Sequence, residues 1–197
     1  MKWRPVLLTL LLTCCGSDPV SRTYVLSPPV DPVARAVSEA GRPVLEVRRV
    51  SVPDYLDTTD IVSRDGRNEL KVSSTGHWGE RLSVGITDAL AADLRRRPLP
   101  FLIVGPAFSG QPAREVAVDV DAFDVRQDGS CVLTARWTIL GEDQKPNPGG
   151  QLDTFVTYVT RTAEGTADAA VSAAMAGAID QLAGKIGSGL ALTSGGR

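Results

Sequence analysis

Regular alternation of apolar and polar residues predicts most of the strands in this chain. The run Val44–Val52 is rich in β-branched residues and stops at Pro53, which is typical of a strand. Two short alternating runs, 61–64 and 69–73, flank Asp65-Gly66 and predict a hairpin, because Asp-Gly favours a tight turn. Short apolar runs predict further strands at 23–26, 101–104 and 152–161.

A second and longer hairpin is predicted from the runs 115–126 and 130–140, which are joined at an Asp-Gly pair. Alternating valines from 116 to 120 share one face of the first arm. The apolar phase then switches to Phe123. Such a switch is typical of a β-bulge, which we expect near Asp121-Ala122.

Two helices are predicted from apolar residues that recur every three or four positions. The first helix carries a stripe made of Leu82, Ile86, Leu90 and Leu94. We interpret Arg95-Arg-Arg97 as its solvated C-terminal end, where the helix dipole favours cations, and Pro98 stops the helix. The second helix is alanine-rich, is predicted over 167–190, and carries a stripe made of Val171, Met175, Ile179, Leu182, Ile186 and Leu190.

These elements predict one compact α/β (α+β) domain over residues 23–192. A mixed or antiparallel sheet would be covered by the two main helices, the second of them at the C-terminus. A chain of 197 residues has room for a single domain with a substantial core. Residues 193–197 are expected to form a disordered tail.

The first seventeen residues have the layout of a secretory signal peptide. Lys2 and Arg4 precede an apolar run that is too short to span a bilayer, and the run ends at Cys14-Cys15. The pattern resembles a bacterial lipobox, in which a cysteine becomes the acylated first residue of the mature chain. Cys15 fits as the acceptor and Cys14 is the alternative; a non-lipidated signal or a short buried helix is the competing interpretation. We therefore expect a lipoprotein signal peptide at 1–14 and a lipidated tether at 15–22.

Composition excludes several classes of function. Loss of Lys2 and Arg4 with the signal would leave 19 of the 21 basic residues against 23 acidic ones, so no excess of positive charge is available for nucleic acid. Three cysteines are present, and Cys131 is the one outside the N-terminal pair. It shares the phase of the core residues in its predicted strand and is expected to be buried and structural.

No residue pattern in the chain indicates catalysis. His77 is the single histidine and stands next to Trp78, which favours packing; Trp78 and Trp137 are both expected in the core. One histidine cannot build a typical zinc site, and no nucleophile elbow or phosphate-binding loop is present. Carboxylates on the second hairpin, at Asp119, Asp121, Asp124 and Asp128, are expected to form a solvated sheet face. We expect neither catalytic residues, nor a metal, nor a cofactor.

Three segments carry a resemblance to a known family. They are Val50-Ser-Val-Pro-Asp-Tyr-Leu-Asp57 with Asp60-Ile-Val-Ser-Arg64, then His77-Trp-Gly-Glu-Arg-Leu82, and then Phe123 with Leu133-Thr-Ala-Arg-Trp137. In this order, behind a lipobox and ahead of an alanine-rich helix, they resemble the PqiC-like auxiliary lipoproteins of ABC-type and MCE-type transport systems. Asp54 and Thr58-Thr59 depart from the family pattern.

The resemblance implies a compact α/β domain anchored to the outer membrane by lipid and facing the periplasm. It implies a non-catalytic accessory subunit in envelope lipid transport, with an MCE-domain membrane protein and its transporter complex as partner. Phospholipid and further copies of the chain are additional partners to consider. The alternative functions are a lipoprotein scaffold for a cell-wall or envelope assembly machine, and a periplasmic hydrolase.

Partner contact is expected at the segment Pro53-Asp-Tyr-Leu-Asp57. A proline and an aromatic residue between two strands make a stiff amphipathic surface, so Pro53, Tyr55, Leu56 and Asp57 are the candidate residues. The competing interpretation is that Tyr55 and Leu56 pack inward and close the edge of the sheet.

Overall fold

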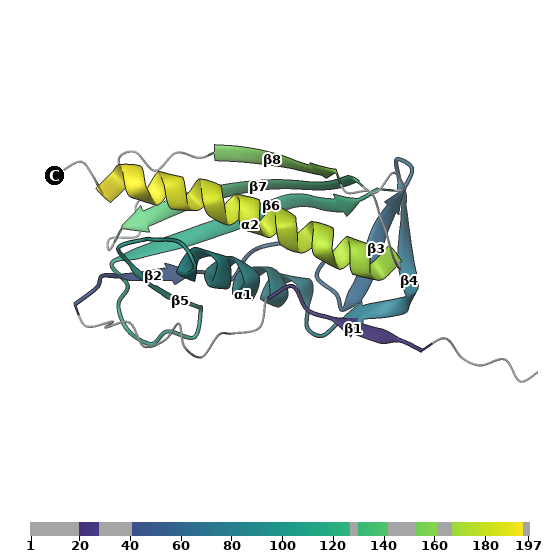
Figure 1. Cartoon of the computed structure of the whole chain (residues 1–197), viewed down its shortest axis with the longest axis horizontal. Helices are drawn as coiled ribbons and strands as arrows, with labels where there is room; N and C mark the ends of the chain where they lie inside the picture. The colour runs from purple at the N-terminus through teal and green to yellow at the C-terminus, as the bar shows by residue number, and fades with distance from the viewer. Residues whose placement is uncertain (1–19, 28–40, 127–129, 142–152, 161–166, 195–197) are drawn as a thin grey trace, which may run out of the picture.

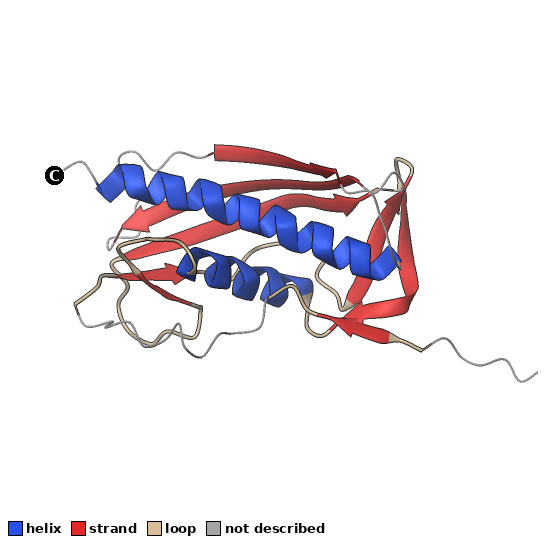
Figure 2. Cartoon of the chain, in the orientation of Figure 1, coloured by secondary structure: helices blue, strands red, loops and turns tan. Residues whose placement is uncertain are grey.

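The computed structural model describes residues 20–27, 41–126, 130–141, 153–160 and 167–194 (Figure 1). These residues form a larger sheet and a smaller sheet, with both helices on one face of the larger sheet (Figure 2). The mixed strand directions, the two helices and the C-terminal position of the second helix confirm the predicted fold class. The division into two sheets was not predicted.

The large sheet has the strand order β5-β2-β6-β7-β8. Its strands are β2 (Val44–Val47), β5 (Leu102–Val104), β6 (Arg114–Val125), β7 (Ser130–Gly141) and β8 (Asp153–Thr160). The last three strands pair antiparallel, whereas β2 runs parallel to both of its neighbours. The predicted bulge is confirmed, because the β6–β7 register shifts between Val120 and Ala122.

The predicted strand over 44–52 is shorter than expected. Strand β2 ends at Val47, although the Arg48 amide still donates to the Val116 carbonyl of β6 at 3.0 Å. The next pairing with β6 is the bridge between Ser51 and Asp119, and the exposed Arg49 lies between these contacts. Val50 turns into the core, and its amide donates to the side-chain oxygen of Thr87 at 3.0 Å.

Helices α1 (Leu82–Arg95) and α2 (Ala167–Ser194) lie side by side across the large sheet (Figure 1). Both predicted apolar stripes are buried, as are Ala174, Ala178 and Ala183 beside the second stripe. Small residues let α2 approach the sheet closely: a side chain at Gly189 would lie 2.6 Å from the ring of Trp137. The helix continues to Ser194, four residues past its predicted end.

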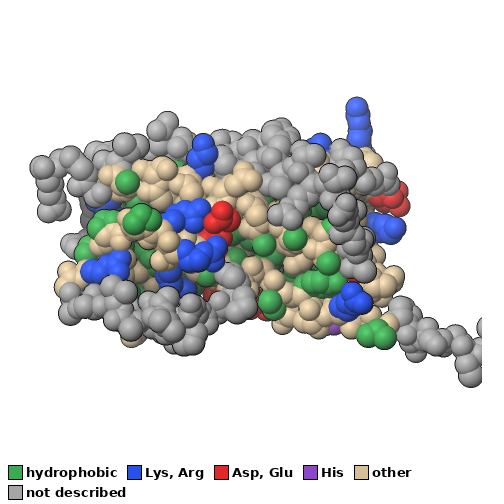
Figure 3. All heavy atoms as spheres, viewed as in Figure 1, with side chains coloured by type: hydrophobic (Ala, Val, Ile, Leu, Met, Phe, Trp, Pro, Cys, Tyr) green, Lys and Arg blue, Asp and Glu red, His purple; other side chains and the backbone are tan. Residues whose placement is uncertain are grey.

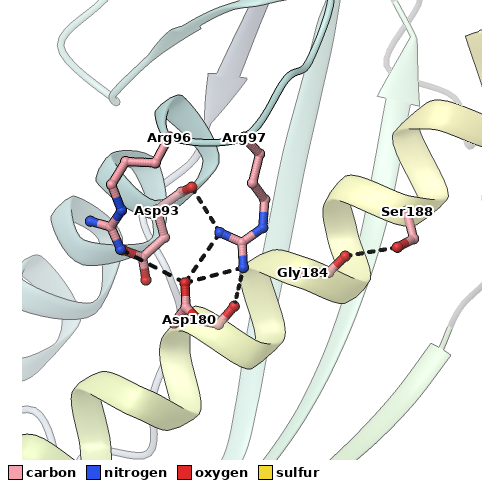
Figure 4. Close-up of polar contacts among 6 residues, drawn as sticks. All are labelled: Asp93, Arg96, Arg97, Asp180, Gly184 and Ser188. Carbon is pink, nitrogen blue, oxygen red and sulfur yellow. Dashed lines mark hydrogen bonds and ion pairs between the residues drawn. The ribbon is translucent and has the colours of Figure 1, made fainter. Parts of the chain in front are cut away.

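Arg95 and Arg96 are exposed at the end of α1, as the solvated-end interpretation expects, but Arg97 is partly buried and binds the neighbouring helix. Arg97 donates to a carboxylate oxygen of Asp180 at 3.1 Å, to the Asp180 carbonyl at 2.6 Å, and to the Asp93 carbonyl at 2.9 Å (Figure 4). Arg96 pairs with Asp93 and with Asp180. Figure 3 shows basic and acidic side chains gathered near the middle of the face that carries the two helices. The cluster joins α1 to α2.

The small sheet has the order β1-β4-β3, with β1 (Arg22–Tyr24), β3 (Asp60–Asp65) and β4 (Glu69–Trp78). Strands β3 and β4 form the predicted hairpin, and Gly66 in its turn has a φ of 74°. Strand β1 runs parallel to the last residues of β4. This sheet stands at one end of the large sheet (Figure 2).

One apolar core serves the whole described chain. It includes residues from both sheets and both helices, among them Trp78 and Trp137, which confirms the prediction for both tryptophans. Cys131 is fully buried, as expected. Desolvation, with a smaller contribution from the nearby Asp124, raises the pKa of its thiol to about 12, so this thiol is unreactive at neutral pH.

Candidate functional site

An exposed apolar surface lies on the β3–β4 hairpin. Tyr55 and Leu70 are each 39% exposed and Val72 is 53% exposed. Leu70 and Val72 are two residues apart on β4 and therefore share a face. Arg64 is paired with Leu70 across the hairpin, and the Tyr55 hydroxyl contacts the Arg64 side chain, which places Tyr55 beside the same face. We call Tyr55, Leu70 and Val72 the hairpin patch.

Tyr55 sits in a tight turn that precedes β3. The amides of Leu56 and Asp57 donate to the Pro53 carbonyl at 2.9 and 3.2 Å, and the amide of Thr58 donates to the Leu56 carbonyl at 2.8 Å. The turn directs Leu56 into the core, where it is 4% exposed, and leaves Tyr55 outside. Of the two orientations left open by the sequence, Leu56 therefore takes the inward one and Tyr55 the outward one.

Asp57 holds the start of α1. Its Oδ1 accepts from the Ser83 amide at 3.1 Å and its Oδ2 from Arg81 Nε at 3.2 Å, so the carboxylate caps a helix whose own preceding residue provides no side-chain cap. Burial opposes ionisation of Asp57, but hydrogen bonds from Ser83 and Arg81 outweigh it and hold its pKa below the ordinary value. The turn is thereby fixed to the helix.

A charged pair lies beneath Tyr55. Arg64 Nε is 3.0 Å from a carboxylate oxygen of Asp124 on β6, and both side chains are mostly buried. Arg64 also approaches the Tyr55 hydroxyl at 3.5 Å, a long and weak contact. Desolvation and the Asp124 carboxylate raise the pKa of Tyr55, so the phenol stays neutral. The prediction of a solvated Asp124 is wrong, because this carboxylate joins the hairpin to the large sheet.

An interruption in β4 separates the hairpin patch from the base of the strand. The β3–β4 register slips between Asp60 and Val62, and Ser73 Oγ accepts from the amides of Thr75 and Gly76 within the slip. Thr75 then donates to the buried Asp168 at the start of α2, at 2.6 Å. The hairpin is therefore fastened to the N-terminus of the long helix.

The base of β4 is held by His77. Its two ring nitrogens lie 3.1 Å from Ser21 Oγ and 2.8 Å from Thr23 Oγ1. A neutral imidazole donates through one nitrogen and accepts through the other, so it can satisfy both hydroxyls. The sequence favoured a packing role for this residue, and in the structure the partly buried His77 fastens β1 to β4.

The remaining predicted residues fall in different places. Asp119 and Asp121 are exposed on β6 as expected, and Asp121 pairs with Arg136 at 2.8 Å. Asp128, Cys14 and Cys15 lie outside the described residues, as do residues 195–197 of the expected tail. Within the described residues no group of three or more His, Cys, Asp or Glu side chains could hold a metal ion. Of the helices described, none has the length and hydropathy that a membrane span requires.

Leu70 and Val72 were not singled out from the sequence. Their alternation with Glu69, Lys71 and Ser73 is the pattern of a strand with one buried face. Nothing in that pattern shows that the face remains uncovered. The missing information is tertiary, because the helices that could cover the hairpin lie over the large sheet instead (Figure 1).

Known proteins agree with this architecture. The chain is 25% identical over 143 residues to the intermembrane transport lipoprotein PqiC of Escherichia coli (strain K12) and to that of Shigella flexneri, covering 73% of this chain and 76% of each relative. A crystal structure of an uncharacterized protein has the same fold, with a TM-score of 0.68 at 20% identity over 86% of this chain and 97% of that one. A protein from Xanthomonas campestris also matches, with a TM-score of 0.61 at 19% identity over 89% and 95% of the two chains.

The model of one protein family matches residues 24–187, which include the hairpin patch, all of α1 and most of α2, but only Tyr24 of β1. The family is described as the ABC-type transport auxiliary lipoprotein component. The match spans most of the chain, and the chain belongs to the family of ABC-type transport auxiliary lipoproteins.

Proposed function

We propose that this protein is a lipid-anchored, periplasm-facing accessory subunit of an MCE/ABC-type envelope lipid transport system. The observation that carries the proposal is the family match over residues 24–187, located directly behind a lipobox-like sequence. In this proposal Cys15 is acylated and holds the domain at the outer membrane. The domain itself performs no catalysis; it assists the transporter by binding it.

The hairpin patch is the proposed contact for the MCE-domain partner. It combines exposed aliphatic residues with an aromatic side chain, a composition that suits the centre of a protein interface. The Tyr55 hydroxyl contacts Arg64, which pairs with Asp124 on the large sheet. Asp57 fastens the turn that carries Tyr55 to α1. Such a preorganised surface loses little conformational entropy on binding. Pro53 and Tyr55 would touch the partner, whereas Leu56 and Asp57 would support them from within.

Co-purification of the acylated protein from detergent-extracted membranes tests this proposal. The expected result is recovery of an MCE-domain protein together with phospholipid. Tyr55→Ala and Val72→Asp should each reduce recovery of that protein, since an aromatic anchor at an interface often contributes about 2 kcal/mol or more. Asp119→Ala is the control, because Asp119 is exposed on β6 of the large sheet and lies outside the hairpin patch.

Each part of the proposal can be contradicted separately. Recovery of cell-wall synthases without an MCE-domain protein would favour the scaffold function. Equal losses with Tyr55→Ala and Asp119→Ala would show that the hairpin patch is not the contact. Cys15→Ser should release the protein from membranes; release by Cys14→Ser alone would assign the acyl group to Cys14. The mass of the purified protein relative to its chain mass would report on homo-oligomers.

A further inference from the structure

Two exposed valines flank the edge strand β1 at the other end of the small sheet. Val20 is 83% exposed and Val25 is 60% exposed, on either side of β1. We call these two residues the stem surface. Figure 3 shows hydrophobic side chains where the chain enters β1, near the histidine. Single exposed valines are common in proteins, so any function for these two depends on where they lie.

The stem surface is held firmly on the domain. His77 bonds Ser21 and Thr23, and the Gly79 amide donates to the Tyr24 carbonyl at 2.8 Å. The segment is therefore an integral strand and not a loose linker. Replacing either valine should leave the core intact, because both side chains point to solvent.

A shallow apolar recess adjoins Val25. Its lining includes Tyr24, Leu26, Trp78 and Leu82. It encloses no space even for a water molecule, so it cannot hold a phospholipid. It extends the apolar surface around Val25 without forming a ligand site.

The length of the chain ahead of β1 identifies what the stem surface can reach. Cys15, the acceptor in the proposed function, is five residues before Val20. Even a fully extended segment of that length spans only about 18 Å. Residues 20–26 contain no acidic residue, and Arg22 is exposed among them. The bilayer that holds the acyl group is therefore close enough for the two valines to reach. Its negatively charged phosphates would attract Arg22, the one charged residue of this segment.

We propose that β1 rests on the phospholipid bilayer, with Val20 and Val25 in the headgroup region. The inference rests on the proposed lipid anchor and adds an orientation to it. Val72 precedes Trp78 by six residues on β4, at most about 20 Å of strand. With the base of β4 on the membrane, the hairpin patch is carried away from the bilayer and toward the periplasmic partner.

The test uses full acylated protein on vesicles of phosphatidylethanolamine and phosphatidylglycerol that carry a doxyl quencher near the headgroups. Val25→Cys and Val72→Cys are each labelled with a nitrobenzoxadiazole fluorophore. These two positions are matched, since both are exposed valines, one directly after β1 and one on β4. The buried Cys131 does not compete for the label. We expect a several-fold loss of emission at position 25 and little change at position 72.

The outcomes separate the orientation from the anchor. Protein that floats with the vesicles but keeps full emission at position 25 would overturn the orientation while the anchor stands. Equal quenching at both positions would overturn it as well. Protein that never floats, in a preparation whose mass includes the acyl group, would overturn the anchored function together with this inference.

Discussion

The two sheets are made from the same kind of alternating strands, but they use their apolar residues in different ways. In the large sheet, one apolar face lies under α1 and α2, and Phe123, Leu133 and Ile139 are almost completely buried. In the small sheet, Leu70, Val72 and the neighbouring Val25 remain exposed. Burial of apolar surface is the main source of stability. The large sheet therefore stabilises the domain, and the small sheet presents surfaces for contact.

Truncating one side chain in each of the two regions should show the largest difference in stability between them. Ile179→Ala removes a fully buried side chain of α2 and should lower the free energy of unfolding by about 2–5 kcal/mol. Val72→Ala should change it by less than about 0.5 kcal/mol, since the side chain is half exposed. Denaturation by urea measures both. A cost at Val72 as large as that at Ile179 would show that the hairpin belongs to the stabilising core.

Gly76 tests how the small sheet is joined to α2. A Cβ at this position would lie 2.8 Å from an Asp168 carboxylate oxygen and 2.9 Å from the Tyr24 ring. Gly76→Ala should therefore cost about 1–3 kcal/mol in thermal or chemical unfolding. The same substitution at Gly177, inside α2 with nothing within 4 Å of its Cβ position, should stabilise by about 0.5–1 kcal/mol. Changes of the same sign at both glycines would refute the close contact at Gly76.

Asp57 tests the link between the Pro53–Asp57 turn and the helix layer. Asp57→Ala removes the acceptor for the Ser83 amide and should cost about 0.5–2 kcal/mol, whereas Asp57→Asn keeps an acceptor and should cost less. Urea denaturation of the two variants beside the parent measures this difference. Equal costs for Ala and Asn would show that Asp57 does not act as a cap.

The same carboxylate predicts a pH dependence. Its pKa is lower in the folded than in the unfolded chain, so its contribution is present above the unfolded pKa of about 3.9 and is lost as the pH falls through the folded pKa. Unfolding free energies of the parent and Asp57→Asn should therefore converge at acid pH. A gap between them that stays constant down to acid pH would contradict this sign.

The smallest effect is expected at the contact between the helices. Asp180→Asn removes the charge that pairs with Arg96 and Arg97, but Arg97 keeps its bonds to the carbonyls of Asp93 and Asp180. Because Asp180 is half exposed, the cost should be below about 1 kcal/mol and should shrink further in salt. Thermal unfolding at low and high salt measures it. A larger, salt-independent cost would mean that the charge itself holds the helices together.

Local patterns predicted the local parts of this fold. The β3–β4 hairpin, the bulge at Asp121-Ala122 and the buried stripe of α2 all follow from spacing within short windows, and all are observed. Contacts between distant residues left no such signal. The parallel pairing of β1 with β4 and the ion pair between Arg97 and Asp180 join segments far apart in the chain. Periodicity describes one element at a time and carries no information about which elements meet.

The candidate site was predicted in part. The sequence singled out the Pro53–Asp57 segment as the candidate contact. It could not decide which of Tyr55 and Leu56 faces the core, because the segment forms a tight turn, in which side chains do not alternate between two faces as they do along a strand. It also missed Leu70 and Val72, whose exposure depends on where the helices lie. The sequence indicated a solvated Asp124, which in fact binds Arg64 on the neighbouring hairpin. In each case the outcome depends on an element that is remote in the sequence.

Photo-crosslinking in intact cells tests whether the partner contacts the hairpin patch at the small sheet. A photoreactive residue is placed at Tyr55 on the hairpin patch or at Asp119, which is exposed on the large sheet. We expect an adduct with an MCE-domain protein from position 55 and none from position 119. An adduct from position 119 with none from position 55 would contradict this expectation.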